Sequence, residues 1–230
     1  MTPRIGLLLA LAAAGCSGLD EGEAGVVGIE VRVPGPDTVE VGESIQLSAK
    51  PLDKNGDSVG ASVTWLSADA AATIDPATGV LTGVSPGTAR VQATVGALGS
   101  ALITFAVVPP ADTLIIAGDS VFDVPPETPT SPPLVTRVES FNPAGALPGR
   151  GVIYAITSPD PDAATPTVTL TSGVVVDTIT TAADGTATTA LTVLTGTAPP
   201  DSVIVEVRTK RTRGAAVAGS GQRFIVRFLP

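Results

Sequence analysis

Residues 78–95 read TGVLTGVSPGTARVQATV, in which two turn signals each precede a short segment of strand-forming residues. The first signal, Thr78-Gly79, leads into Val80-Leu81-Thr82, and the second, Pro86-Gly87, leads into Thr88 to Val95. Glycine and proline favour tight turns, whereas valine and threonine favour the extended backbone of a β-strand. The stretch therefore predicts two strands separated by a turn.

The same pattern of short strands and turns extends from Val26 to Val108. At its start, apolar residues occupy every second position, as in a half-buried strand: Val27, Ile29, Val31 and Val33. A second strand is expected over Ser44–Ala49, and Asn55-Gly56 is a strong turn signal. Seven such segments in about 80 residues predict a β-sandwich.

The composition of the 230-residue chain agrees with two domains of this kind. Hydrophobic residues make up 43% and charged residues 15%, so there are enough apolar side chains for packed cores. Aromatic residues make up only 3%, and Thr, Val, Gly and Pro dominate the middle of the chain, a mixture typical of strands and turns. We therefore expect an all-β protein with two tandem sandwich domains, over residues 26–111 and 112–230.

The first of these segments resembles a known family, the bacterial immunoglobulin-like domain of group 2. The matching residues follow one another over nearly the whole segment: Val41 to Leu47, Val63 to Trp65, Ile74-Asp75, Gly79 to Gly83 and Pro86 to Ala89. The resemblance implies an immunoglobulin-like β-sandwich, and we expect Trp65 to pack between its two sheets. The alternative for Trp65 is an exposed ring that stacks on a ligand.

Residues 112–230 show the same pattern with longer strands and a proline-rich segment at 125–133. Because proline lacks the N–H donor that a central strand needs, we expect a stiff excursion there. This half resembles the group 1 family of bacterial immunoglobulin-like domains, the type found in invasin and intimin adhesins. The resemblance lies in three stretches: Pro133 to Val138, Pro148 to Val152 and Thr181 to Ala187. It fails at Asn142 to Pro148, which replaces the family's Asp-x-x-Gly-Asn-Pro-Val turn.

The N-terminal residues 1–15 have the features of a signal peptide. Arg4 supplies the positive start, and Ile5 to Ala14 is an apolar run broken only by Gly6. This run is too short to cross a bilayer, which takes about 20 residues. Residues 16–25 are mostly small or acidic and are expected to form a flexible tether.

Cys16 is the predicted lipidation site. Ala13-Ala14-Gly15-Cys16 resembles the lipobox of bacterial lipoproteins, although Ala13 stands where the family usually has leucine. The resemblance implies a diacylglyceryl group on Cys16, and Ser17 after it implies sorting to the outer membrane. The alternative is ordinary cleavage at Ala12-Ala13-Ala14, which would leave a free thiol near the new N-terminus.

Several function classes are disfavoured by what the sequence lacks. It has no histidine, so Ser-His-Asp and Cys-His catalytic sites cannot be built, and its single cysteine cannot form an intrachain disulfide. A net charge of −9 argues against nucleic acid as a partner. Asp53 to Asp57 resembles the start of a calcium loop but lacks the glycine and glutamate that such loops need, where Ser58 and Thr64 stand, so we expect a polar hairpin turn. Asp160 and Asp162 are expected to lie in a solvated loop.

We therefore predict no catalytic, cofactor-binding or metal-binding residues, and a protein that is not an enzyme. The expected function is a lipid-anchored protein of the bacterial envelope, facing the periplasm or the cell surface, that serves as a surface spacer or an adhesive module. The alternative is an accessory lipoprotein that binds polysaccharide. The expected partners are the membrane, through the N-terminal lipid, and an envelope polysaccharide or another surface protein.

Basic residues gather near the C-terminus, at Arg208, Lys210, Arg211, Arg213, Arg223 and Arg227. The glycines at 214, 219 and 221 predict that both flanking strands belong to one long hairpin. Its tip is expected to form a local positive patch. The patch is interpreted either as charge that keeps an edge hairpin soluble or as a docking site for an anionic envelope polymer.

Overall fold

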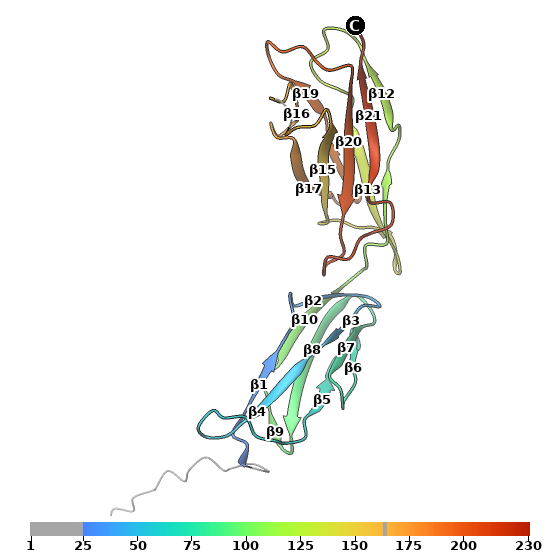
Figure 1. Cartoon of the computed structure of the whole chain (residues 1–230). Helices are drawn as coiled ribbons and strands as arrows, with labels where there is room; N and C mark the ends of the chain where they lie inside the picture. The colour runs from blue at the N-terminus through green and yellow to red at the C-terminus, as the bar shows by residue number, and fades with distance from the viewer. Residues whose placement is uncertain (1–24, 163–164) are drawn as a thin grey trace, which may run out of the picture.

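The computed structural model describes residues 25–162 and 165–230, and these form two β-sandwiches placed end to end (Figure 1). The first sandwich contains strands β1 to β10 and the second contains β11 to β21. The described chain begins at the far end of the first sandwich, and the C-terminus lies at the opposite end of the second. The prediction of an all-β fold of immunoglobulin-like sandwiches is confirmed.

The first sandwich is built from short strands, as the frequent turn residues predict. Their bounds are β1 Gly28–Arg32, β2 Thr38–Glu40, β3 Ser44–Gln46, β4 Ser48–Leu52, β5 Thr64–Ser67, β6 Ala72–Ile74, β7 Val80–Gly83, β8 Gly87–Val95, β9 Leu98–Gly99 and β10 Ile103–Val108. One sheet has the order β2-β10-β8-β5, with β9 paired to β8, and β2 runs parallel to β10. The remaining strands form the three-stranded sheet β3-β7-β6 and the pair β1-β4.

Alternation along the strands places one row of apolar side chains between the sheets. In β8, for example, Ala89, Val91, Ala93 and Val95 are buried, whereas the residues between them are at least partly exposed. Ala89, Val91 and Ala93 pack with Trp65, Phe105 and Leu81 in one continuous core. Burial of apolar surface at about 25 cal/mol per Å² is the main driving force for such a fold.

The second sandwich has longer strands. Their bounds are β11 Thr113–Ile116, β12 Val121–Val124, β13 Leu134–Phe141, β14 Ala144–Ala146, β15 Gly151–Ser158, β16 Val168–Leu170, β17 Val176–Thr180, β18 Thr186–Thr189, β19 Leu191–Val193, β20 Ser202–Thr209 and β21 Gln222–Phe228. One sheet has the order β12-β21-β20-β15-β17, and the other contains β11-β13-β14 with β18 paired to β13. Strands β16 and β19 form a separate pair.

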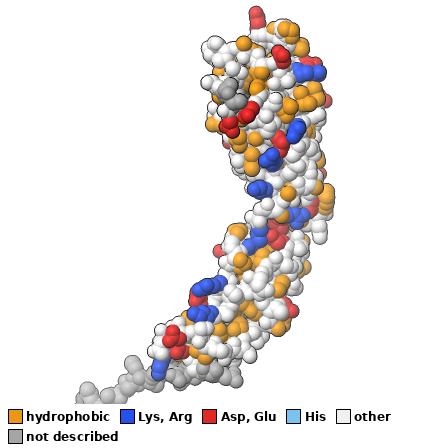
Figure 2. Space-filling view, viewed as in Figure 1, with side chains coloured by type: hydrophobic (Ala, Val, Ile, Leu, Met, Phe, Trp, Pro, Cys, Tyr) orange, Lys and Arg blue, Asp and Glu red, His pale blue; other side chains and the backbone are white. Residues whose placement is uncertain are grey.

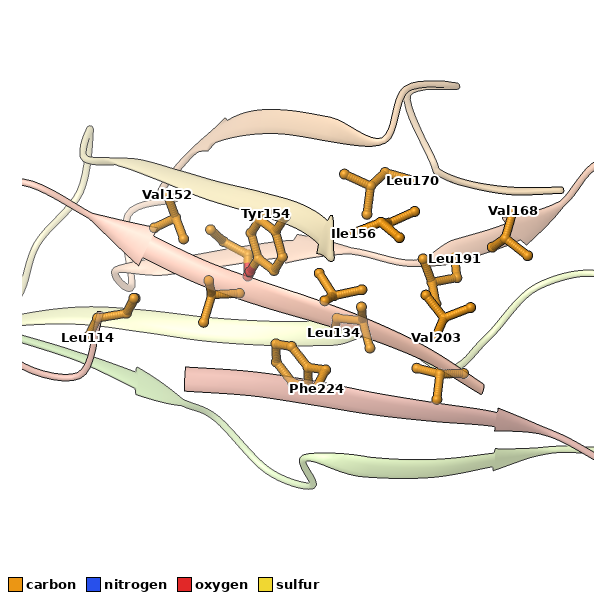
Figure 3. Close-up of a cluster of buried hydrophobic side chains, with 14 of the residues drawn as sticks. Leu114, Leu134, Val152, Tyr154, Ile156, Val168, Leu170, Leu191, Val203 and Phe224 are labelled. Carbon is orange, nitrogen blue, oxygen red and sulfur yellow. The ribbon is translucent and has the colours of Figure 1, made fainter. Parts of the chain in front are cut away.

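The core of the second sandwich lies between these sheets and is shown in Figure 3. Leu134 from β13, Val152 and Tyr154 from β15, Val203 from β20 and Phe224 from β21 all turn their side chains inward. Each of these residues is fully shielded from solvent. The proline-rich segment contains no strand, but its Ser131 N–H donates to the carbonyl of Leu191 in β19.

One expected strand is divided in the structure. The segment Ser44–Ala49 was predicted as one strand, but it changes sheet at the buried Leu47, so that β3 pairs with β7 and β4 pairs with β1. The chain also changes sheet at Ala190, since β18 pairs with β13 and β19 pairs with β16. Within the described residues, no helix is long and apolar enough to cross a membrane.

Candidate functional site at the junction of the two sandwiches

The residues singled out from the sequence do not form one site. Cys16 lies outside the described residues. Trp65 is only 4% exposed and belongs to the first core, which confirms its predicted packing role and leaves no ring surface for a ligand. Asp160 and Asp162 are both exposed, as predicted.

The Asp53 loop is a hairpin turn, as predicted from Asn55-Gly56. The Asp53 carboxylate accepts hydrogen bonds from the backbone N–H groups of Asn55 and Asp57, at 2.9 and 2.8 Å. These donors, with Asp57 the strongest, lower the pKa of the Asp53 carboxyl. The carboxylate therefore caps its own turn. No group of three or more side chains suited to a metal occurs in residues 25–162 and 165–230.

The predicted C-terminal hairpin is present. Strands β20 and β21 pair antiparallel, from Ser202 opposite Arg227 to Val207 opposite Gln222. Arg208 and Arg223 on its strands both pair with Glu206, and the hydrogen bond from Arg208 is the main cause that lowers the pKa of the Glu206 carboxyl. At the tip, the expectation of a local positive patch is wrong for Arg211 and Arg213, because both side chains lie against the first sandwich and pair with its carboxylates.

The junction between the sandwiches is lined by charged side chains, and Figure 2 shows acidic and basic residues gathered at this narrow region. We call the following residues the junction cluster: Glu40 and Glu43 of the first sandwich, Asp112 of the linker, and Arg150, Arg211, Thr212 and Arg213 of the second. The charged members are three carboxylates and three guanidiniums, so their formal charges balance.

Glu40, at the end of β2, is the centre of the junction cluster. Its side chain is fully buried, and its Oε1 atom lies 3.0 Å from Nη1 of Arg150. The same oxygen accepts hydrogen bonds from the backbone N–H and the hydroxyl of Thr212, each at 3.0 Å. The other oxygen, Oε2, forms an ion pair with Nη1 of Arg211 at 3.7 Å and has no hydrogen-bond donor among the described residues.

The two outer arginines reach backbone carbonyls. Arg150 donates from Nη2 to the carbonyl of Pro109 in the linker, at 2.6 Å. Arg213 donates from its guanidinium to the carbonyls of Pro34 and Pro36, the latter at 2.7 Å, and pairs with Glu43 at 3.8 Å. Arginine suits this role because its five N–H donors are spread over a rigid plane.

Asp112 connects the linker to the second sandwich. One of its oxygens accepts a hydrogen bond from Nη2 of Arg211 at 2.7 Å, and the other accepts from the backbone N–H of Phe141 at 2.7 Å. Arg211 thereby bridges Asp112 and Glu40. The arrangement is suited to holding two protein surfaces together, and every atom of it belongs to this chain.

An apolar hollow lies at the end of the second sandwich away from the junction. It has a volume of about 170 Å³ and is lined mainly by Ile156, Pro159, Val168, Val175 and Val203. Polar groups that could orient a ligand are few in its lining, and Asp160 at its rim is exposed. The junction is therefore the place where charge, burial and hydrogen bonds converge.

Comparison with known proteins identifies the first sandwich. Residues 31–105 match the family described as the bacterial Ig-like domain (group 2), which confirms the resemblance stated for this segment. The group 1 assignment of the second sandwich stays a prediction. No curated protein matches the chain by sequence.

Among solved structures, the chain is similar to the adhesin InvE of Yersinia pseudotuberculosis, with 16% identity over 85% of this chain and 57% of that one, and a TM-score of 0.40. It is also similar to the D00-D0 domain of intimin, with 16% identity, coverage of 88% and 100%, and a TM-score of 0.34. Domains 4 and 5 of the S-layer protein SbsC give 15% identity, coverage of 90% and 100%, and a TM-score of 0.35.

Proposed function

We propose that this protein is a lipid-anchored spacer of the bacterial envelope, which carries its second sandwich away from the membrane as a structural or adhesive module. The observation that carries the proposal is the end-to-end placement of the sandwiches, with the two ends of the described chain at opposite poles (Figure 1). An anchor before the first sandwich would therefore place the C-terminal end far from the lipid. The match of residues 31–105 to a bacterial immunoglobulin-like family supports a structural or adhesive module.

The anchor in this proposal is an acyl group on Cys16, the single cysteine of the chain. The test compares Cys16→Ser with wild type, and uses Ser17→Ala as a control that keeps the cysteine. Wild type and Ser17→Ala are expected in the membrane fraction, with lipid on the N-terminal peptide by mass spectrometry. Cys16→Ser is expected in the soluble fraction. Membrane association of Cys16→Ser equal to wild type would refute the anchor.

The proposed localisation is the outer membrane, facing the periplasm or the cell surface. In the adhesive role, the proposed partner is an envelope polysaccharide or another surface protein. Protease treatment of intact cells separates the two orientations: digestion of the second sandwich without cell lysis supports surface display, and digestion only after lysis supports a periplasmic orientation.

The alternative, a polysaccharide-binding accessory lipoprotein, has less support. Sugar faces stack on exposed aromatic rings, but of the aromatic side chains, all of which are described, only Phe141 is exposed, at 67%, and Phe122 is half-buried. Retention on polysaccharide beads tests this alternative. Retention that free sugar reverses, and that Phe141→Ala abolishes, would favour it over the spacer role.

A further inference from the structure

The two sandwiches are connected by a linker with little freedom of its own. Only four residues, Pro109 to Asp112, separate the end of β10 at Val108 from the start of β11 at Thr113. Two of the four are prolines, whose ring fixes the backbone angle φ near −65°. Ala111 is fully buried and belongs to the core of the second sandwich. The remaining freedom lies in the rotation of one sandwich against the other about this short link.

Three arginines of the junction cluster oppose that rotation. Arg150 contacts Glu40 and the linker, Arg211 contacts Glu40 and Asp112, and Arg213 contacts the segment before β2. Since these contacts reach different parts of the first sandwich and the linker, a rotation that keeps one of them must break another. A network of this kind has one geometry in which all its members are paired.

Glu40 has a special place in this network because it receives two guanidiniums. Its carboxylate is fully buried when the sandwiches are docked, and the groups that contact its oxygens, from Arg150, Arg211 and Thr212, all belong to the second sandwich. A buried charge is tolerated only when it is paired. Loss of the negative charge would leave both guanidiniums of the second sandwich without this counter-ion in a poorly solvated space, and separation of the sandwiches would let water reach them.

We propose that Glu40 fixes the angle between the two sandwiches, so that they move as one rigid body rather than as two domains on a hinge. The proposal concerns the shape of the chain and does not depend on the lipid anchor or on any ligand. A spacer with a fixed joint holds its outer end in a defined direction, whereas a hinged one sweeps a wide volume. Glu40, Arg150 and Arg211 act here as positioning residues.

The experiment measures the distance distribution between two spin labels, one on each sandwich. Labels are attached at Leu66→Cys on β5 and Val176→Cys on β17, because both side chains are exposed and lie away from the junction cluster. The full chain carries Cys16→Ser, so that the labelled thiols are the only ones. Glu40→Gln is compared with the unchanged junction. A single narrow distance distribution is expected for the intact junction. Glu40→Gln is expected to increase the width of this distribution roughly twofold or more, because further orientations become populated.

Glu206→Gln is the matched control. Glu206 is also a largely buried carboxylate that pairs with two arginines, but it lies within the second sandwich, on β20. The substitution Glu206→Gln should therefore leave the distance distribution unchanged. Arg213→Gln is a second junction variant that removes the contacts to the carbonyls of Pro34 and Pro36 and should also widen the distribution.

Trypsin provides an independent measurement. Cleavage after Arg213 requires its side chain to leave the first sandwich, so the rate reports the fraction of undocked molecules. Glu40→Gln is expected to accelerate this cleavage by about tenfold or more, because the cleavage rate follows the fraction of undocked molecules. The signals of Trp65 and Tyr154, one in each sandwich, verify that both remain folded. A broad distribution with the intact junction, or equal widths and cleavage rates for Glu40→Gln and Glu206→Gln, would overturn the proposal.

Discussion

The phenol oxygen of Tyr154 and the hydroxyl oxygen of Thr136 lie 2.7 Å apart in the centre of the second sandwich, and both residues are fully buried. Tyr154 belongs to β15 in one sheet and Thr136 to β13 in the other. The phenol also donates to the carbonyl of Ala187 in β18, at 2.6 Å. This pair is therefore a polar connection between the two sheets inside the core of the second sandwich.

Tyr154→Phe keeps the ring but removes its hydroxyl group, which leaves the Thr136 hydroxyl and the Ala187 carbonyl without this partner. We expect a loss of about 1–3 kcal/mol in the free energy of unfolding, the usual cost of unsatisfied buried polar groups. Urea unfolding followed by circular dichroism measures the loss. Thr180→Val on the exposed side of β17 is the control and should stay within about 0.5 kcal/mol of wild type. A free energy of unfolding for Tyr154→Phe equal to that of wild type would mean that the connection does not stabilise the sandwich.

The titration of Tyr154 gives a second prediction, because it is the only tyrosine of the chain. Burial raises its pKa to about 12 in the folded protein, against about 10 in the unfolded chain. Between these values the folded state binds more protons than the unfolded state, so stability falls as the pH rises. The contribution of the protonated Tyr154 phenol to the free energy of unfolding is fully present below about pH 10, and roughly 2–3 kcal/mol of it is lost by about pH 12.

The absorbance of tyrosinate measures this pKa directly in native protein and in denaturant. The native midpoint should lie well above the denatured one. Tyr154→Phe supplies the control for stability, because its unfolding free energy should lack this alkaline decrease. Coincident native and denatured titrations would show that the phenol is accessible to solvent.

Trp65→Ala tests the core of the first sandwich. Trp65 is 4% exposed and packs in the first core, so its truncation should cost about 3–5 kcal/mol. The neighbouring Leu66 points outward and is 52% exposed, so Leu66→Ala should cost less than about 0.5 kcal/mol. Calorimetry is the suitable measurement, because the first variant has no tryptophan. Similar costs for the two variants would contradict the assignment of Trp65 to the core.

The all-β fold and the packing of Trp65 could be predicted from the sequence, because alternation and turn residues are local signals. The division of Ser44–Ala49 into two strands could not. Ile45, Leu47 and Ala49 keep the same alternation on both sides of the division. The change of sheet depends on a distant contact, in which the Leu47 N–H donates to the carbonyl of Gly79 at 3.0 Å.

The junction cluster was missed for a related reason. Strand β2 has only three residues and a single buried apolar side chain, Val39, so no periodic pattern identifies it. An acidic residue in such a segment is ordinarily a surface residue. The partners that make burial of Glu40 possible lie far along the chain: Arg150 and Arg211 pair with its carboxylate, and Thr212, which also donates to it, lies 172 positions away. The basic hairpin tip was visible in the sequence, but nothing local indicated that it faces the first sandwich.

A comparison of Gly79→Ala with Gly56→Ala separates the cost of backbone strain from the cost of steric conflict. Gly79 has a φ of +75°, and a Cβ atom there would lie 2.6 Å from Nε1 of Trp65 and 3.1 Å from the carbonyl oxygen of Leu47. Gly56 has a similar φ of +85°, but a Cβ atom there meets nothing within 4 Å. Gly56→Ala should therefore cost only the strain of a left-handed backbone, about 1 kcal/mol.

Gly79→Ala carries the same strain and must also displace the buried indole or the backbone, which adds about 1–3 kcal/mol. The fluorescence of Trp65, the only tryptophan, follows urea unfolding in both variants and should also change in native Gly79→Ala as the ring shifts. Equal unfolding free energies for Gly56→Ala and Gly79→Ala, with an unchanged native spectrum, would show that Trp65 does not pack against the turn at Gly79.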